Sequence, residues 1–331
     1  MSESNPNEPI LQSGSSPRDL HSWEREALVR IAQAGLIEQR RARRWGIFFK
    51  LLGFAYLLAI LMLIVLPRSG GESPLEAEGN ETVAAVIDIK GVIADGELTS
   101  AERVNESLRK AFEAESVKGV ILHLNSPGGS PVQSGRIYDE IVRLKEVHPD
   151  KPVYAVIEDV CASGGYYIAA AADHVVADRA SIVGSIGVRM DSFGFVGAIE
   201  KLGIERRLYT AGNDKALLDP FLPENPEQVA HVEAMLDNIH EQFINAVRAG
   251  RGDRLADDPA IWSGLVWSGE QAVPMGLVDE LGDLDMVVRD RLALDQTVDM
   301  TPQSDPFERF FGRLEATGAG IIERLGQVTW H

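Results

Sequence analysis

Residues 153–172 read VYAVIEDVCASGGYYIAAAA. A β-branched apolar run gives way to small residues and then to an alanine-rich run, which predicts a buried strand followed by a helix. Ser163 lies at this junction, where a helix start favours developing negative charge and the adjacent Gly164 and Gly165 leave room for a substrate backbone. The same small residues also suit close packing of a strand on a helix, so a catalytic and a structural role for Ser163 both stay open at this point.

The surrounding sequence repeats this alternation of apolar strands and amphipathic helices. A β-branched run at 83–93 is followed by helical spacing, and a second apolar run at 119–124 leads into NSPGG at 125–129 and another helix. The pattern predicts an α/β fold with a mainly parallel sheet. Because the carboxyl ends of parallel strands meet at one edge of a sheet, we expect NSPGG and Ser163 to lie near each other.

Farther along the chain, residues 223–252 predict one long helix that starts near prolines and ends at a glycine. A shorter helix is expected around 194–202, and a strand is expected around ERRLYT at 205–210. Between this strand and the long helix lies GNDKALLDPF, which contains Lys215.

The N-terminal region contains a long apolar run, WGIFFKLLGFAYLLAILMLIVL, at 45–66. Its single charge, Lys50, lies near one end, and its length suits the roughly 30 Å hydrocarbon core of a bilayer. Four arginines between positions 40 and 44 precede the run, and the segment after it is mostly acidic. The positive-inside rule therefore predicts a single-pass inner-membrane protein with a cytoplasmic N-terminus and a periplasmic or otherwise extracytoplasmic main domain.

Composition excludes some classes of function. The formal net charge of −18 argues against a nucleic-acid partner, since phosphate binding needs a basic surface. The single cysteine, Cys161, excludes an internal disulfide. Its position two residues before Ser163 suggests a rival nucleophile, but a small buried residue that closes the strand is the better interpretation.

A serine nucleophile needs a base within hydrogen-bond reach and donors for the oxyanion. None of the seven histidines has a favoured position, and no G-x-S-x-G elbow is present, which disfavours a Ser-His-Asp triad. Lys215 is a second candidate, because a lysine can act as a general base where a dry environment lowers its pKa. A solvated loop lysine is the usual alternative, so the residues alone leave the base undecided.

Several motifs in order resemble the SppA (signal peptide peptidase) family in its short bacterial form, over about residues 80–290. They are the single apolar span, NSPGG, CASGGYYIAAAAD, SIVGSIGV, a lysine before a Pro-Phe pair, and WSGEQAVPMGLVDELG. This resemblance implies a ClpP/crotonase-like fold and a serine peptidase with a Ser-Lys dyad. Ser163 would be the nucleophile, Lys215 the base and Ser185 a partner that holds the lysine, while the N–H groups of Gly128 and Gly129 would form the oxyanion hole.

Taken together with the resemblance, the sequence predicts a domain order and a set of partners. The expected parts are a tail at 1–44, a membrane span at 45–66, a linker at 67–80, a peptidase domain at 81–295 and a C-terminal tail at 296–331. Expected partners are the lipid bilayer, apolar peptides such as signal peptide remnants, and further copies of the chain in a homo-oligomer that brings the lysine from a neighbour. No metal or organic cofactor is implied.

Three other functions stay open on the sequence. A related protease could act on unfolded or membrane proteins instead of signal peptides. A crotonase-like enzyme could act on acyl-CoA, although the apolar span and the acidic composition disfavour that ligand. The third alternative is a non-catalytic scaffold that uses this fold for assembly.

Overall fold

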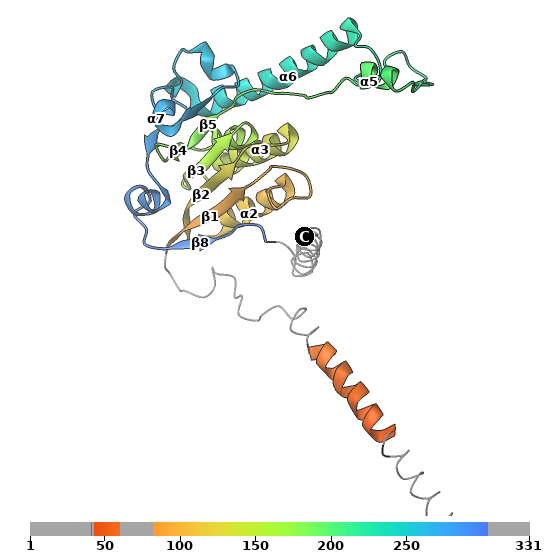
Figure 1. The fold of residues 1–331 in the computed structure, drawn as a ribbon. Helices are drawn as coiled ribbons and strands as arrows, with labels where there is room; N and C mark the ends of the chain where they lie inside the picture. Colours follow the sequence, from red (N-terminus) through yellow and green to blue (C-terminus); the bar gives the residue numbers. More distant parts are fainter. Residues whose placement is uncertain (1–40, 42, 60–81, 304–331) are drawn as a thin grey trace, which may run out of the picture. The chain divides into compact units, whose positions relative to one another are not determined.

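A computed structural model describes residue 41, residues 43–59 and residues 82–303 of the chain (Figure 1). The chain divides into two compact units, residues 1–70 and residues 71–331. The expected tail at 1–44, the linker at 67–80 and most of the expected C-terminal tail lie wholly or largely outside the described residues.

The first unit contributes one described element, a helix that covers residues 43–59. The predicted membrane span therefore lies within the described part up to residue 59, and its last residues, 60–66, lie outside it. Among the helices in the described ranges, none combines the length and the apolar character needed to cross a bilayer.

The second unit contains a mainly parallel sheet, as predicted. Within the described residues eight strands join in the order β6-β5-β3-β2-β1-β8, with β4 beside β3 and β7 beside β4. Only the β5–β6 pair is antiparallel among these. The strands are β1 (Val83–Lys90), β2 (Val117–Ser126), β3 (Val153–Ala162), β4 (His174–Ala177), β5 (Ile182–Gly184), β6 (Val266–Ser268), β7 (Glu280–Leu281) and β8 (Thr297–Asp299). Since β8 pairs with β1, the sheet continues past the domain boundary expected at residue 295.

Helices cover both faces of the central strands. The helices are α2 (Ala101–Glu113), α3 (Pro131–Val147), α4 (Gly164–Ala169), α5 (Val196–Lys201), α6 (Pro226–Arg251), α7 (Gly269–Ala272) and α8 (Leu284–Met286), followed by a π-helical turn at Val287–Arg291. Along β1, Ala85, Ile87 and Ile89 pack with α2 and α3, whereas Ala84 and Val86 pack with residues around 287–294 on the other face. This burial on both faces explains why the central strands read as continuous apolar runs.

The long helix α6 is joined firmly to the sheet domain at its C-terminal half (Figure 1). Phe243 stacks on Tyr167 of α4, with ring centroids 4.8 Å apart. Near the end of α6, a Cβ at Gly250 would collide with the Ala170 carbonyl, so glycine permits this close approach. The buried Arg251 side chain then binds the Asp279 carboxylate through both terminal nitrogens, at 2.8 and 2.9 Å.

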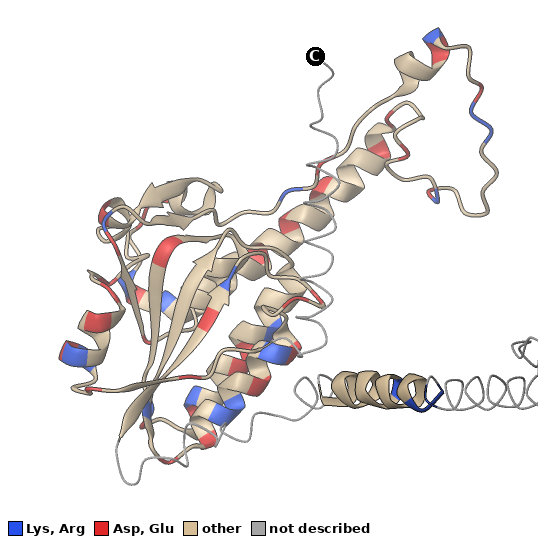
Figure 2. Cartoon of the chain, turned by 60° about the horizontal axis from the view of Figure 1, so that its bottom comes forward, with Lys and Arg blue, Asp and Glu red and all other residues tan. Residues whose placement is uncertain are grey.

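The N-terminal end of α6 carries an extended segment, residues 187–225, which we call the arm. Apart from α5, the arm has no regular secondary structure, so the strand predicted at 205–210 is wrong. Residues 205–210 have no neighbouring strand with which to pair among the described residues, and Tyr209 remains 90% exposed. Figure 2 shows that most of the arm is uncharged. Among its uncharged residues are large apolar side chains, such as Phe193 and Leu202, that are more than two-thirds exposed.

Candidate active site

Ser163 occupies a strained backbone position between β3 and α4. Its φ is 52° and its ψ is −121°, a conformation that residues other than glycine rarely adopt and that costs about 1–3 kcal/mol. Two backbone hydrogen bonds hold it there: the Ser163 N–H donates to the Gly184 carbonyl at 2.8 Å, and the Tyr167 N–H donates to the Ser163 carbonyl at 2.9 Å. Such strain persists where the surroundings enforce it, and it concentrates at functional sites.

The NSPGG turn lies directly against this serine, as the sheet topology predicts. A Cβ added to Gly128 would lie 2.7 Å from both the Ser163 Cβ and the Gly164 nitrogen. Both turn glycines have positive φ, 100° at Gly128 and 154° at Gly129. Only glycine therefore fits at Gly128, for reasons of space and of backbone conformation.

The two predicted oxyanion donors differ in availability. The Gly128 N–H already donates to the Ser126 hydroxyl at 3.1 Å, and this hydroxyl donates in turn to the Gly91 carbonyl at 2.6 Å. The Gly129 N–H has no partner within the described residues, and neither has the Gly164 N–H. Gly164 is thus a donor that sequence reasoning missed, although its place directly after the candidate nucleophile pointed to it.

Ser185 lies next to the candidate nucleophile across the sheet. Ala162 of β3 is paired with Gly184 of β5, and Ser185 follows at the end of that strand. Its φ is 53°, and its N–H donates to the Leu265 carbonyl at 2.7 Å. The next carbonyl, that of Ile186, lies 3.0 Å from the His240 Nε2 on α6, which ties this loop to the long helix.

Lys215 is exposed in the arm and is not brought to Ser163 within one chain. Its neighbour Asp214 accepts a hydrogen bond from the Gln228 side chain at 2.9 Å, close to the N-terminus of α6. Phe243, which contacts α4, lies about 22 Å farther along the same helix at 1.5 Å per residue. The Lys215 loop and the Ser163 helix therefore contact distant parts of α6, and the Lys215 side chain makes no hydrogen bond or ion pair within the described chain.

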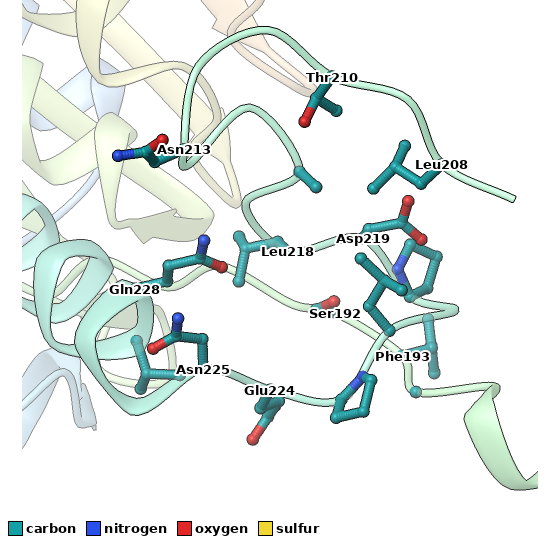
Figure 3. A pocket seen from close by; sticks show the side chains of 16 residues that line it. Ser192, Phe193, Leu208, Thr210, Asn213, Leu218, Asp219, Glu224, Asn225 and Gln228 are labelled. Carbon is teal, nitrogen blue, oxygen red and sulfur yellow. The ribbon is translucent and has the colours of Figure 1, made fainter. Parts of the chain in front are cut away.

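The arm encloses a hollow of about 380 Å³ against the first turn of α6 (Figure 3). Phe193, Leu208 and Leu218 line it together with polar side chains that include Asn213 and Gln228. None of the five predicted site residues lines this hollow, which is therefore separate from the site at Ser163.

Other reactive groups do not complete a different site around Ser163. Cys161 is buried, and this burial raises the pKa of its thiol, so the thiolate is disfavoured. Within the described residues no histidine hydrogen-bonds Ser163; His123, for example, binds Asp88 at 2.8 Å. No group of three or more His, Cys, Asp or Glu residues in the described ranges could hold a metal ion.

Comparison of the sequence with known proteins places this chain among peptidases. Residues 145–299 match the model of "Peptidase family S49". The chain is 33% identical over 239 residues to a putative signal peptide peptidase SppA of Enterococcus faecium, which covers 69% of each protein. It is 34% identical over 222 residues to a putative protease of Methanocaldococcus jannaschii, over 65% of this chain and 70% of that protein.

A third similarity is to a longer protein. The chain is 44% identical over 214 residues to a Brucella abortus protein named as the Na(+)/H(+) antiporter NhaA, over 63% of this chain. The matched region spans only 29% of that relative. The chain thus covers less than a third of the antiporter-named relatives that it matches.

Proposed function

Because this chain belongs to the SppA family, within peptidase family S49, we propose that it is a serine peptidase with Ser163 as the nucleophile. The observation that carries this proposal is the strained Ser163 backbone beside two N–H groups, those of Gly129 and Gly164, that have no partner within the described residues. The surrounding structure enforces this strain and fixes Ser163, which is half-buried, at the end of strand β3. The nearby N–H groups can stabilise the negative charge that develops on a carbonyl oxygen under attack.

The proposed reaction proceeds through an acyl-enzyme. The Ser163 Oγ attacks the carbonyl carbon of the scissile peptide bond as the Lys215 amine takes the hydroxyl proton. The C–N bond breaks, the lysine returns its proton to the leaving amine, and an ester on Ser163 remains. Water then attacks this ester with the same lysine as base, which releases the new carboxylate and restores the serine.

This mechanism requires Lys215 to come from a second copy of the chain. Within one chain the arm holds Lys215 away from Ser163, so a dyad needs a neighbour whose arm reaches across. The exposed apolar side chains of the arm support such an assembly, because contact with another copy would bury them. Ser185, beside Ser163, is the residue that we propose receives the incoming lysine.

We further propose that residues 45–66 anchor the peptidase in the inner membrane, with the peptidase domain outside the cytoplasm. The apolar run and the arginines before it support this topology. Apolar peptides such as signal peptide remnants are the proposed substrates, since an anchored enzyme meets them where they are released. Extraction of membranes with alkaline carbonate tests the anchor: the full chain should stay in the pellet, whereas a chain that begins at residue 67 should not.

The decisive test of the activity is the Ser163→Ala variant. Purified full-length protein should cleave a signal peptide, and the variant should lose this cleavage while circular dichroism and melting temperature show an intact fold. Normal turnover by the variant would exclude Ser163 as the nucleophile. A parallel assay with an unfolded protein distinguishes the two substrate classes, because a quality-control protease would cleave it faster than the signal peptide.

A further inference from the structure

The turn that carries the Gly129 N–H lies directly against the start of α4. A Cβ on Gly164, the residue after Ser163, would lie 3.2 Å from the Gly129 nitrogen and 3.5 Å from the Gly128 Cα. Both turn glycines have positive φ, and glycine adopts positive φ about as readily as negative φ. The glycines therefore impose no direction of their own, so other contacts must orient the Gly129 N–H.

The carbonyl of Gly128 is the first of these contacts. It accepts a hydrogen bond from the Ile93 N–H at 2.9 Å, and the Ile93 carbonyl accepts one from the Ser130 N–H at 2.7 Å. The Gly128 carbonyl and the Gly129 N–H belong to one planar trans peptide unit, in which the two groups point in opposite directions. The bond to Ile93 thus turns the Gly129 N–H away from Ile93.

The Ser126 hydroxyl is the second contact, and it acts on the other side of Gly128. Ser126 is 0% exposed. Its hydroxyl accepts a hydrogen bond from the Gly128 N–H at 3.1 Å and donates one to the Gly91 carbonyl, just after β1, at 2.6 Å. Because a hydroxyl can accept and donate at once, this one side chain links the turn to the end of the neighbouring strand. Alanine at this position could make neither bond.

Ser126 also packs against the helix that follows Ser163. It is the last residue of β2 and is paired with Cys161 of β3. A Cβ on Gly165, in the first turn of α4, would lie 3.1 Å from the Ser126 carbonyl oxygen and 3.4 Å from the Ser126 Cβ. The residue that contacts the turn is therefore packed in the same unit as the proposed nucleophile.

We propose that Ser126 is a positioning residue of the peptidase site, whose hydroxyl holds Gly128 so that the Gly129 N–H points at the oxygen of the carbonyl under attack. This inference rests on the proposed peptidase function. Ser126 acts through Gly128 and does not touch the substrate. A donor that is held in place before the reaction stabilises the charge of the transition state more than it stabilises the bound substrate. Loss of the Ser126 hydroxyl should therefore slow the chemical step and leave substrate binding intact.

The Ser126→Ala variant tests this role. We expect kcat to fall by on the order of 100-fold with KM little changed, because the oxyanion donor is misplaced. A peptide boronic acid forms a tetrahedral adduct with a serine nucleophile, so its inhibition constant Ki should rise in parallel.

A purely structural role of Ser126 would give a different result. It would lower the folded fraction and with it the apparent kcat, but the folded molecules would keep their KM and their Ki for the boronic acid. A kcat within about fivefold of wild type, or a lower kcat with an unchanged Ki, would overturn the proposal.

A matched control is Ser181→Ala. Ser181 is 2% exposed, and its hydroxyl also donates to a backbone carbonyl, that of Glu158. This variant should lose stability but keep its kcat and its Ki. If Ser126→Ala does not fold, Ser126→Cys serves instead, since a thiol donates and accepts only weakly, and the same changes in kcat and Ki are expected. That variant is assayed with a reducing agent, because Cys161 lies opposite position 126.

The same assays distinguish failure of this inference from failure of the peptidase proposal. If wild-type protein cleaves no peptide, or Ser163→Ala cleaves as well as wild type, the peptidase proposal itself fails. If wild type is active, Ser163→Ala is inactive and Ser126→Ala keeps full kcat, only the role of Ser126 is refuted.

Discussion

Phe243 of α6 stacks face to face on Tyr167 of α4, with an interplanar angle of 19°. Tyr167 lies one helical turn after Ser163, whose carbonyl accepts the Tyr167 N–H. The helix that carries the arm is therefore packed directly on the helix that follows the proposed nucleophile.

Loss of that contact should destabilise the fold. Phe243 is 4% exposed, so Phe243→Ala is expected to lower the free energy of unfolding by about 3–5 kcal/mol. Equilibrium denaturation in urea measures this change. Met235→Ala is the control, because Met235 lies on the same helix but is exposed, and its effect should stay within about 0.5 kcal/mol. Equal effects of the two substitutions would contradict the packing described here.

Two inactive variants should restore activity together. Ser163→Ala and Lys215→Ala are each expected to be inactive, but co-expression places an intact Ser163 of one copy beside an intact Lys215 of another. In a randomly mixed assembly in which each site draws Ser163 from one copy and Lys215 from another, about a quarter of the sites would be complete. Peptide hydrolysis by affinity-purified mixed assemblies measures this recovery. Mixed assemblies that form and remain inactive would refute sharing of Lys215 between chains.

The fit of Gly128 against Ser163 predicts a sharp effect of one methyl group. In Gly128→Ala the new Cβ would meet the Ser163 Cβ and the Gly164 nitrogen, which displaces the nucleophile and the proposed donor. A misplacement of this kind costs on the order of 100-fold in kcat. Gly96→Ala is the matched control: Gly96 also has positive φ, 80°, but its Cβ position is open. Both variants carry backbone strain, and only Gly128→Ala should lose activity in the peptide assay.

Stability should fall in acid because of the Arg251–Asp279 ion pair. Burial alone would raise the pKa of Asp279, but hydrogen bonds from Arg251 and from the Val175 N–H outweigh it and hold this pKa below its usual value. A carboxyl group with a lowered pKa in the folded state binds fewer protons there than in the unfolded chain. Its contribution is therefore present above about pH 4 and is lost as the pH falls through the folded-state pKa.

The Asp279→Asn variant tests this assignment. It should lose about 3–5 kcal/mol at neutral pH, because the buried Arg251 would keep its charge without a partner. Its stability should also depend less steeply on pH below about 4, as measured by urea denaturation across a pH series. Asp257→Asn, at an exposed position, should leave both the stability and its pH dependence unchanged. A steep acid dependence that survives in Asp279→Asn would assign the effect to other carboxylates.

Local sequence pattern was sufficient for the main elements of the fold. The continuous apolar runs of β1, β2 and β3 and the helical spacing of α2, α3 and α6 are properties of each segment that do not depend on distant contacts. From parallel strands alone it followed that NSPGG and Ser163 meet at one edge, because strands of one direction end at the same side of a sheet. The identity of Ser163 as a candidate and its closeness to Gly128 could thus be predicted.

Only the tertiary structure decided which groups at this edge are available. The Ser126 hydroxyl binds the Gly128 N–H, so that in the described part of the chain Gly129 and Gly164 are the glycines here whose N–H groups lack a partner, and no local pattern encodes that choice. Residues 205–210 have no strand beside them in the described part of the chain, so their backbone stays irregular. The separation of Lys215 from Ser163 follows from the length of α6 and its packing on α4. Hydrogen-bond partners and distances between remote segments are set by the packing of the whole domain, and for that reason the sequence alone does not reveal them.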